Sequence, residues 1–418
     1  MVQLSTFPEQ TRQQIEQIGA VDLVIGLVDH KATERIAVIA DTTRHGLTRL
    51  SNSPRAVVLY RDASANTTAV LSNSVRENDS LWFLCYSATA PQPSLTLVDS
   101  ISPAYHSFGN VSQRLNARAC IVLTSSPECL TSDWIYGLTH PILEDDYDLV
   151  TPCYAPHKFE SLLNNAILYP TTRALYGKRI QNPLGPDFSF SSRLFPTLVD
   201  SPKVRGTALR LPLIALEAVI KSLKICQVHL GKRTYPIIDW KNLDSILAEV
   251  LDPLFLGIER DVVFWQHIRS SAPVPVYGEL LSFSEESTAI DPRRLIEPFK
   301  LGFRNLQEIW SLVLPPTTLL ELTKADRLPA EQFRVPDELW ARIVYDFVLA
   351  YHLRTIGRDH LLRALTPLYL GWIASYAIEV ESLPSAAVQR RWERLCVAFE
   401  NAKPYLVSRW RWPDRFNP

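Results

Sequence analysis

The residues best suited to chemistry by type and spacing lie between positions 165 and 195. Arg173, Lys178 and Arg179 lead into a turn rich in glycine and proline, where Asp187 follows the letters PLGP. A carboxylate on a stiff turn beside three cationic side chains suits the binding of a polar small molecule. The competing interpretation is that Asp187 only caps the segment that follows it, and the sequence leaves both open.

A second candidate position is the end of the apolar run at 118–123, which is followed by Thr124, Ser125 and Ser126. Ligands of open α/β sheets bind beyond the carboxyl ends of the strands, so a side chain at this position could reach a ligand. Hydroxyl groups are neutral and weak ligands for a divalent cation, which prefers carboxylate oxygens. The sequence therefore predicts a strand end without an acidic metal ligand.

Other patterns that could carry chemistry are weaker. Residues 144–148 read EDDYD and could hold a divalent metal, but a run of charges between a helix and a strand is more often a solvated turn. The sequence contains no HExxH pair, GxSxG elbow, GxxxxGK[ST] loop or GxGxxG turn. We therefore expect neither a zinc-binding helix, a serine-hydrolase site nor a glycine-rich phosphate loop.

The carboxy-terminal letters SRWRWPDRF, residues 408–416, alternate arginine with tryptophan. Such a pattern could stack on nucleic-acid bases or lie on a membrane. The formal net charge is −1, so no global basic field attracts the chain to nucleic acid or to an anionic membrane. We expect this segment to pack as a terminal clamp, and we expect no nucleic-acid partner.

The elements that must position these residues alternate between strand and helix in the first half of the chain. Apolar runs at 21–28, 55–60, 80–87, 118–124 and 147–155 are separated by amphipathic segments, which is typical of βαβ units and a mostly parallel sheet. After position 239 the apolar residues recur at helical spacing. The sequence predicts an α/β domain over 1–238 and a helical region over 239–418.

Composition is that of an ordinary globular protein, with 46% hydrophobic and 21% charged residues among 418. None of the six cysteines forms a CxxC pair, so we expect buried free thiols in a reducing compartment. The first residues lack the basic and apolar regions of a signal peptide. The stretch 364–378 is short and contains Pro367, so we expect a core helix rather than a membrane span. These features predict a cytoplasmic protein.

Five stretches together resemble one family. They are residues 133–194, ICQVHLG at 225–231, VPVYG at 274–278, residues 335–354, and DHLLRALTPLYLG at 359–371. The chain resembles the bacterial GT-A glycosyltransferases related to mannosylglycerate synthase and to glucosylglycerate-type synthases. The resemblance implies a GT-A nucleotide-diphospho-sugar domain followed by a helical region. It also implies retaining transfer from a GDP- or UDP-sugar to a small acceptor such as glycerate, with a divalent metal.

The chain departs from the family where that chemistry takes place. On the family's nucleotide-binding turn it keeps Asp62 and Ser64 but has Asn66 where a further Asp-Gly turn belongs. The family's Asp-x-Asp falls on hydroxyls, and its late metal-binding histidine falls on a tyrosine. The residues at this altered metal site are Thr124, Ser125, Ser126 and Tyr235. A diphosphate needs its negative charge offset by Mg²⁺ or Mn²⁺, and these side chains cannot anchor one alone.

Two functions follow from this comparison. The first is a catalytically degenerate protein with a glycosyltransferase body, which binds a protein or small-molecule partner and needs no cofactor. The second is an active metal-independent transferase, in which Asp187 contacts the acceptor and Arg173, Lys178 or Arg179 faces the donor diphosphate. Only an active enzyme of the family's usual type would need Mg²⁺ or Mn²⁺. The sequence gives no oligomeric state and leaves a homodimer open.

Overall fold

The protein is described by a computed structural model that covers residues 9–28, 35–61, 80–86, 97–126, 128–155, 157–185, 187–199, 213–233, 240, 242–279 and 290–413. The chain forms two compact units. The sheet unit comprises residues 1–155, 180–236 and 274–281, and the helical unit comprises 156–179, 237–273 and 282–418. Asp62, Ser64, Asn66 and Tyr235 lie outside the described residues.

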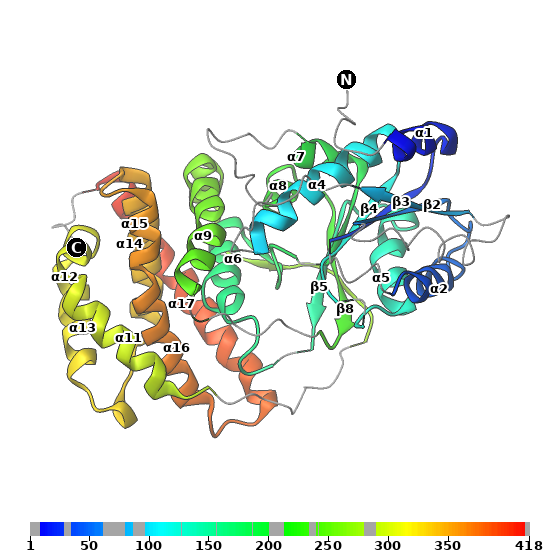
Figure 1. The fold of residues 1–418 in the computed structure, drawn as a ribbon. Coiled ribbons are helices and arrows are strands. Elements are labelled where there is room, and N and C mark those ends of the chain that lie inside the picture. Colours follow the sequence, from blue (N-terminus) through cyan, green and yellow to red (C-terminus); the bar gives the residue numbers. More distant parts are fainter. Residues whose placement is uncertain are drawn as a thin grey trace. The chain divides into compact units, whose positions relative to one another are not determined.

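An eight-stranded sheet forms the centre of the sheet unit (Figure 1), with the order β10-β8-β5-β7-β4-β1-β2-β3. All neighbouring strands are parallel except β7, which runs antiparallel between β4 and β5. The strands are β1 Leu23–Leu27, β2 Ala56–Arg61, β3 Leu81–Tyr86, β4 Ala119–Leu123, β5 Leu149–Tyr154, β7 Phe188–Ser191, β8 Ile225–Gly231 and β10 Val276–Tyr277.

Helices cover both faces of this sheet, and the central strands are accordingly apolar throughout. β1, β4 and β5 are buried at every position, as expected for parallel strands between two helical layers. Ile25 packs in one core with Ile36 of α2 and Ile135 of α5. On the opposite face, a β-carbon at Gly26 would lie 2.3 Å from the Phe108 ring of α4, so only glycine fits there. The helices are α1 Glu9–Ile18, α2 Ile36–Leu47, α4 Leu97–Arg114, α5 Ser132–Leu143, η3 Ser192–Leu194, α7 Phe195–Val199 and α8 Ile214–Ile220.

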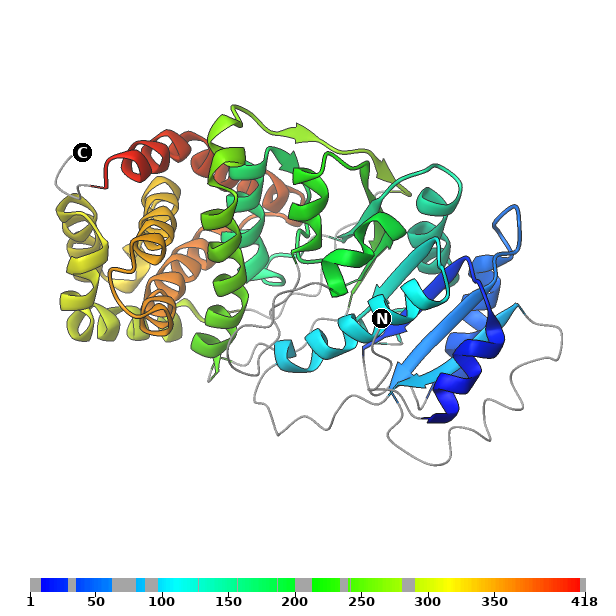
Figure 2. The same cartoon turned by 90° about the horizontal axis from the view of Figure 1, so that it is seen from above.

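The helical unit is built of helices (Figure 2) that enclose a core of large aromatic side chains. Trp265, Trp310, Trp340 and Trp372 are fully buried within it, where each indole buries a large apolar area. Its only described strands are a two-residue pair, β6 Lys178–Arg179 and β9 Ala272–Pro273. Its helices are η2 Asn164–Leu168, α6 Tyr169–Tyr176, α9 Leu243–Arg260, α10 Val262–His267, α11 Pro292–Asn305, α12 Gln307–Val313, α13 Pro316–Arg327, η4 Ala330–Gln332, α14 Asp337–Leu353, α15 Arg358–Ala364, α16 Thr366–Val380 and α17 Ser385–Arg411.

The predicted fold class, a mostly parallel sheet followed by helices, is confirmed. The sequence predicts the boundary between the α/β domain and the helical region at 238–239. In the structure the chain passes from the sheet unit to the helical unit at Pro236–Ile237, but two segments lie in the unit that the sequence does not predict for them. Residues 156–179 belong to the helical unit because α6 packs on α17. Residues 274–281 belong to the sheet unit because β10 pairs with β8. The strand β7 is not among the apolar runs from which the sequence predicts strands.

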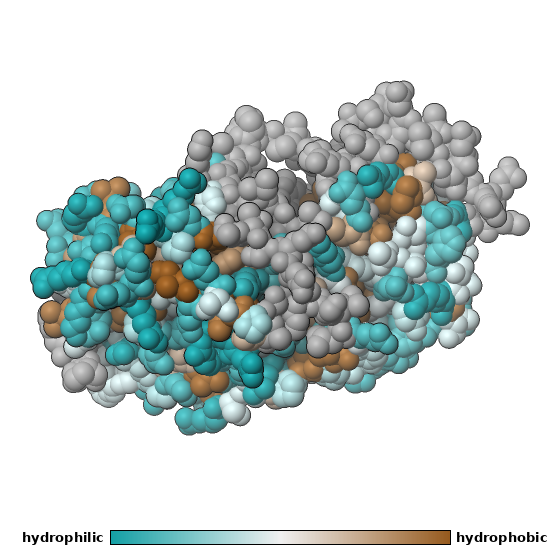
Figure 3. Space-filling model, turned by 90° about the horizontal axis from the view of Figure 1, so that it is seen from below, coloured by the Kyte–Doolittle hydropathy of each residue, from teal (hydrophilic) through white to brown (hydrophobic). Residues whose placement is uncertain are grey.

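Among the described residues, the face shown in Figure 3 is largely hydrophilic, with small apolar patches. One stretch of the described residues, Arg358–Val380, is long and apolar enough to cross a membrane, but 83% of its most apolar window is buried inside the protein. That is typical of a core helix, as the sequence predicts for 364–378. All six cysteines are free thiols, and Cys120, Cys153, Cys226 and Cys396 are buried.

Candidate functional site

The strand topology brings one carboxylate to the edge where ligands of α/β sheets bind. Thr124 and Ser125 directly follow β4, Tyr154 ends β5, and Arg233 lies two residues beyond β8. Because β7 is antiparallel to β4 and β5, its first end lies at the carboxyl ends of those strands. Asp187 immediately precedes β7 and therefore lies at this edge.

Both carboxylate oxygens of Asp187 accept hydrogen bonds. Oδ1 accepts the backbone N–H groups of Thr124 at 2.8 Å and of Ser125 at 2.9 Å. Oδ2 accepts the hydroxyl groups of Ser125 and Tyr154. The Asp187 side chain is completely buried. A buried carboxylate that accepts four hydrogen bonds is fixed in position, because each donor would lose its partner if the side chain moved away.

Arg233 supplies the positive charge beside this carboxylate. Its Nε lies 3.7 Å from Asp187 Oδ2 and donates to Ser125 Oγ at 2.8 Å. The guanidinium also lies over the Tyr154 ring, 5.4 Å from its centroid, within range of a cation–π interaction. Only 14% of the Arg233 side chain is exposed. We call Thr124, Ser125, Tyr154, Asp187 and Arg233 the Asp187 cluster.

The charges of this cluster contribute to the pKa of Tyr105 in α4. Burial, and after it the negative charge of Asp187, raise the pKa of the Tyr105 phenol well above its ordinary value, while Arg233 opposes the shift. The phenol is therefore protonated throughout the physiological range. Its ring packs edge-on against Phe188, the first residue of β7, at 5.9 Å, so α4 supports the strand that follows Asp187.

The described residues at this edge do not fit a divalent metal. Asp187 is the carboxylate of the Asp187 cluster, and both of its oxygens already accept hydrogen bonds from the protein. Across the described part of the chain, no group of three or more His, Cys, Asp or Glu side chains could hold a metal ion. Two groups of Thr124–Ser126 are already engaged in hydrogen bonds within the protein. The Ser125 hydroxyl donates to Asp187 Oδ2, and Ser126 O accepts the Cys129 N–H at 2.9 Å. The arrangement can recognise an anion through Arg233 more readily than it can bind a cation.

Comparisons with known proteins give similarities among solved structures. No protein-family model matches the chain, and no curated protein matches it significantly. The structure of glucosyl-3-phosphoglycerate synthase from Mycobacterium tuberculosis with phosphoglyceric acid is 16% identical with a TM-score of 0.37, covering 60% of this chain and 85% of that one. Mannosyl-3-phosphoglycerate synthase from Rubrobacter xylanophilus is 14% identical with a TM-score of 0.36, covering 64% and 82%.

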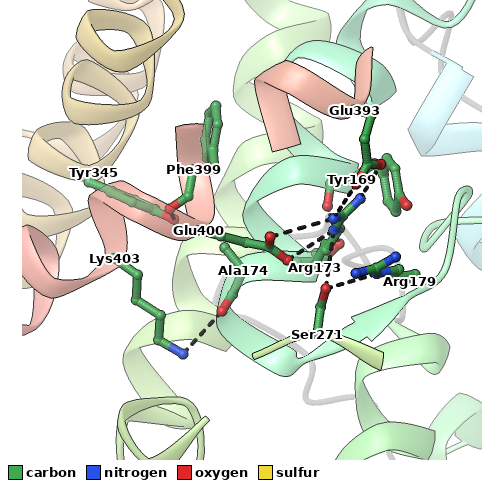
Figure 4. A network of polar contacts seen from close by, with 11 residues as sticks. Tyr169, Arg173, Ala174, Arg179, Ser271, Tyr345, Glu393, Phe399, Glu400 and Lys403 are labelled. Atoms are coloured by element: carbon green, nitrogen blue, oxygen red, sulfur yellow. Dashed lines mark hydrogen bonds and ion pairs between the residues drawn. The ribbon is translucent and has the colours of Figure 1, made fainter. Parts of the chain in front are cut away.

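Arg173, the first cation predicted for the site, lies in the helical unit and is paired there (Figure 4). Its Nη1 and Nη2 donate to the two Glu393 oxygens at 2.6 and 2.7 Å, and its Nε donates to Glu400 at 3.0 Å. Only 1% of the Arg173 side chain is exposed. Burial alone would lower the pKa of the guanidinium, but the hydrogen bonds to Glu393 and Glu400 raise it above its ordinary value. This geometry favours a structural role for Arg173.

The two other predicted cations follow α6 in the short strand β6. Arg179 donates from Nε to Ser271 Oγ at 3.0 Å, and the same oxygen accepts a bond from Arg173 Nε at 3.3 Å. Lys178 is exposed. Both belong to the helical unit, whereas Asp187 belongs to the sheet unit. The predicted roles of Asp187, Arg173, Lys178 and Arg179 toward an acceptor or diphosphate stay predictions.

Sequence reasoning missed two members of the Asp187 cluster. Tyr154 is the last residue but one of the apolar run at 147–155, and Arg233 follows the strand-like letters ICQVHLG by two positions. The rule that points to carboxyl ends of strands was a signal for both. The carboxylates that pair with Arg173 are 220 and 227 residues away in sequence, and no local pattern could indicate them.

Replacing Tyr154 with phenylalanine is expected to lower the free energy of unfolding by about 1.5–3 kcal/mol, the usual range for a hydrogen bond to a charged group. The phenol donates to the buried Asp187 Oδ2, and phenylalanine keeps the ring beneath Arg233. Urea unfolding measures the loss. Tyr136→Phe is the control, because this half-buried tyrosine of α5 carries Arg49 over its ring at 4.1 Å. Equal stability of Tyr154→Phe and the wild type would show that the phenol bond to Asp187 contributes nothing.

Proposed function

We propose that the chain is a glycosyltransferase-like protein that has lost metal-dependent sugar transfer and acts by binding a protein or small-molecule partner. The single observation that carries this proposal is the Asp187 cluster. The carboxylate at the carboxyl edge of the sheet is buried and accepts bonds from Thr124, Ser125 and Tyr154. A group so engaged is not available to hold a metal or to accept a proton from a substrate.

The charge of a nucleotide diphosphate supports the same proposal. Two phosphates carry at least two negative charges, which metal-dependent transferases offset with a divalent cation held by carboxylates. At this edge the family's acidic pair is replaced by Thr124–Ser126, and the backbone N–H of Ser125 already binds Asp187 at 2.9 Å. A metal–diphosphate would have to displace this internal carboxylate before it could bind there.

Arg233 favours a second candidate function, an active metal-independent retaining glycosyltransferase. A guanidinium binds phosphate oxygens through two parallel N–H bonds and stays charged at any physiological pH. Arg233 lies at the carboxyl edge of the sheet, with its side chain 14% exposed. In this function a GDP- or UDP-sugar is the donor, and a small acid such as glycerate is the acceptor. Asp187, Arg173, Lys178 and Arg179 would be required only by this candidate.

We also infer a cytoplasmic location. The free thiols of Cys120, Cys153, Cys226 and Cys396 are buried in the structure, and burial raises the pKa of each to about 12. Such thiols are stable as packing groups in a reducing compartment. Fractionation of the native host cells with an antibody to the chain tests this location.

Thermal unfolding with nucleotide sugars separates the two functions. A ligand that binds the native state raises the melting temperature, and saturation at about 100 Kd adds about 2.7 kcal/mol. For the degenerate protein we expect no manganese-dependent rise with UDP-glucose or GDP-mannose. A rise with Mn²⁺ and nucleotide sugar together, accompanied by sugar transfer, would contradict the loss of metal-dependent chemistry.

Arginine variants identify the second candidate. If the chain is a metal-independent transferase, a nucleotide sugar raises the melting temperature without metal, and Arg233→Gln abolishes that rise. Each variant is compared with its own ligand-free sample, because Arg233 also neighbours the buried Asp187. Arg49→Gln is the matched control in the same unit, since Arg49 is 45% exposed and pairs with Asp133. Loss of the rise in both variants would exclude a specific role for Arg233.

A further inference from the structure

The end of α17 carries the alternating arginine and tryptophan letters that the sequence singles out, and the structure buries part of them. The Trp410 ring lies edge-on to Trp265 of α10 at 5.3 Å and stacks on His352 of α14 at 4.2 Å. The Arg409 side chain is 6% exposed and donates to Asp346 of α14. The predicted terminal clamp is therefore present in Arg409 and Trp410.

Asp346 is buried between α14 and α17, but only one of its carboxylate oxygens has a hydrogen-bond partner. Its side chain is 1% exposed. Oδ1 accepts hydrogen bonds from Arg409 Nη1 at 2.6 Å and from the Tyr405 hydroxyl at 2.7 Å. Within the described part of the chain, Oδ2 is buried and accepts no hydrogen bond, and Arg409 Nε donates none. The ion pair therefore lacks the two parallel bonds that an arginine and a carboxylate can form.

Two comparably buried aspartates show what Asp346 lacks. Asp187 accepts two hydrogen bonds at each oxygen. Asp148 accepts two side-chain donors at Oδ1 and the backbone N–H of Lys224 at Oδ2. Hydrogen bonds to both oxygens favour the charged form of a carboxylate, whereas burial of an oxygen without a donor favours the neutral acid. Among these three aspartates, Asp346 is the one whose surroundings favour the protonated form.

We infer that the α14–α17 junction takes up a proton on Asp346 as the medium is acidified, and that this proton holds the end of α17 closed on α14. Burial raises the pKa of Asp346 to about 7, while Arg409, Tyr405 and Arg342 oppose the shift. When the end of α17 opens, water reaches the carboxylate and its pKa returns toward the ordinary 3.8. The closed form therefore binds the proton more tightly than the open form, so proton uptake favours closure.

The direction of the pH effect follows from these two values. The stabilisation of the closed form is complete below the open-form pKa and is lost as the pH rises through about 7. Between the two values the equilibrium constant for opening rises by up to about tenfold per pH unit, and above the higher value it levels off. This inference concerns the helical unit alone and does not depend on the proposed function.

Other titratable groups near this junction bear on the measurement. The charges that act on Asp346 among the described residues are Arg409 and Tyr405 on α17 and Arg342 on its own helix. Further along α14, His352 lies 3.2 Å from Glu259 of α9. Because histidine side chains in general change charge near neutral pH, opening is compared only between proteins that keep this histidine.

Amide hydrogen exchange of the full chain, followed in peptides from the end of α17, tests the proposal. The wild type and Asp346→Asn are compared in the same buffers from pH 5 to pH 8, so that the intrinsic exchange rates cancel. Asparagine imitates the shape of the protonated carboxyl group but does not titrate. We expect the ratio of the wild-type to the variant opening constant to rise by up to about tenfold per pH unit between pH 5 and pH 7, and to level off above that.

Two further variants sharpen the result. Asp359→Asn makes the same chemical change on a side chain of the helical unit that is 68% exposed, and its ratio to the wild type should not vary with pH. Tyr405→Phe removes a hydrogen bond that lowers the pKa of Asp346, so its opening constant should level off at a higher pH than in the wild type.

Infrared spectroscopy of the wild type checks the proton itself and does not depend on how well a variant folds. At pH 6, where exposed carboxyl groups are ionised, the spectrum should keep a band from a protonated carboxyl group, and a folded Asp346→Asn protein should lack that component. Absence of the band, or an exchange ratio that stays constant from pH 5 to pH 8, would overturn the proposal. A ratio that falls as the pH rises would also overturn it, because it would show that the charged pair with Arg409 holds α17 in place.

Discussion

Asp187→Ala is expected to lower the free energy of unfolding by about 3–5 kcal/mol, the range for removing one partner of a buried charge pair. Asp187 is fully buried, and its oxygens accept two backbone N–H groups and two hydroxyl groups. Alanine leaves all four donors without their acceptor and leaves Arg233 without its neighbouring carboxylate. Chemical unfolding in urea, followed by circular dichroism, measures the loss.

Two further substitutions make this result interpretable. Asp187→Asn keeps the shape but places an N–H group against existing donors, so we expect a loss of about 2 kcal/mol. Asp133→Ala is the surface control, because the Asp133 side chain is 80% exposed and such pairs contribute about 0–1 kcal/mol. An Asp187→Ala protein as stable as the control would contradict a structural role and would reopen Asp187 as a catalytic candidate.

This outcome bears on function because loss of activity alone cannot establish a catalytic role for Asp187. A variant that unfolds loses any activity that depends on the carboxyl edge of the sheet. Activity of a folded Asp187→Asn protein is the informative quantity: retained transfer would exclude Asp187 as an essential base. Lost transfer in a protein that still binds nucleotide sugar would support the second candidate function.

The sequence predicted the fold where local pattern and burial agree. The strands β1, β4 and β5 are continuous apolar runs because helices cover both faces, and α14 begins with Asp337 and Glu338 at its positive end. The exchange of segments between the units could not be predicted, because it depends on pairing between distant elements. α6 and α17 contact each other across more than two hundred residues.

The candidate site was predicted only in part for a similar reason. Asp187 and Ser125 were both singled out, but their hydrogen bond joins residues 62 positions apart. Antiparallel insertion of the four-residue β7 brings them together, and a short alternating segment is a weak signal for a strand inside a parallel sheet. The sequence pattern assigned Arg173 to ligand binding. Its two acidic partners lie on α17 and look like ordinary solvated charges in the sequence, so no local pattern indicated that Arg173 is paired.

The pair Glu393→Gln and Glu400→Gln is expected to lower the free energy of unfolding by about 3–5 kcal/mol, more than Arg173→Met does. The asymmetry follows from burial: the Arg173 side chain is 1% exposed, whereas Glu393 and Glu400 are 50% and 25% exposed. Without arginine, the two carboxylates can turn toward water. Without the carboxylates, a charged guanidinium stays buried with no counter-charge, although glutamine preserves the hydrogen-bonding shape.

The triple variant Arg173→Met, Glu393→Gln, Glu400→Gln is the decisive control, since it removes the buried charge together with its partners. It should recover most of the stability that the glutamine pair loses. The pH dependence has a defined sign, because hydrogen bonding to Arg173 lowers the pKa of Glu393 below its ordinary 4.5. The Glu393 contribution is therefore complete above its unfolded-state pKa and is lost as the pH falls through the folded-state value. The gap between the wild type and Glu393→Gln should close in acid, and a gap that stays constant with pH would show that the charge of Glu393 does not stabilise the buried guanidinium.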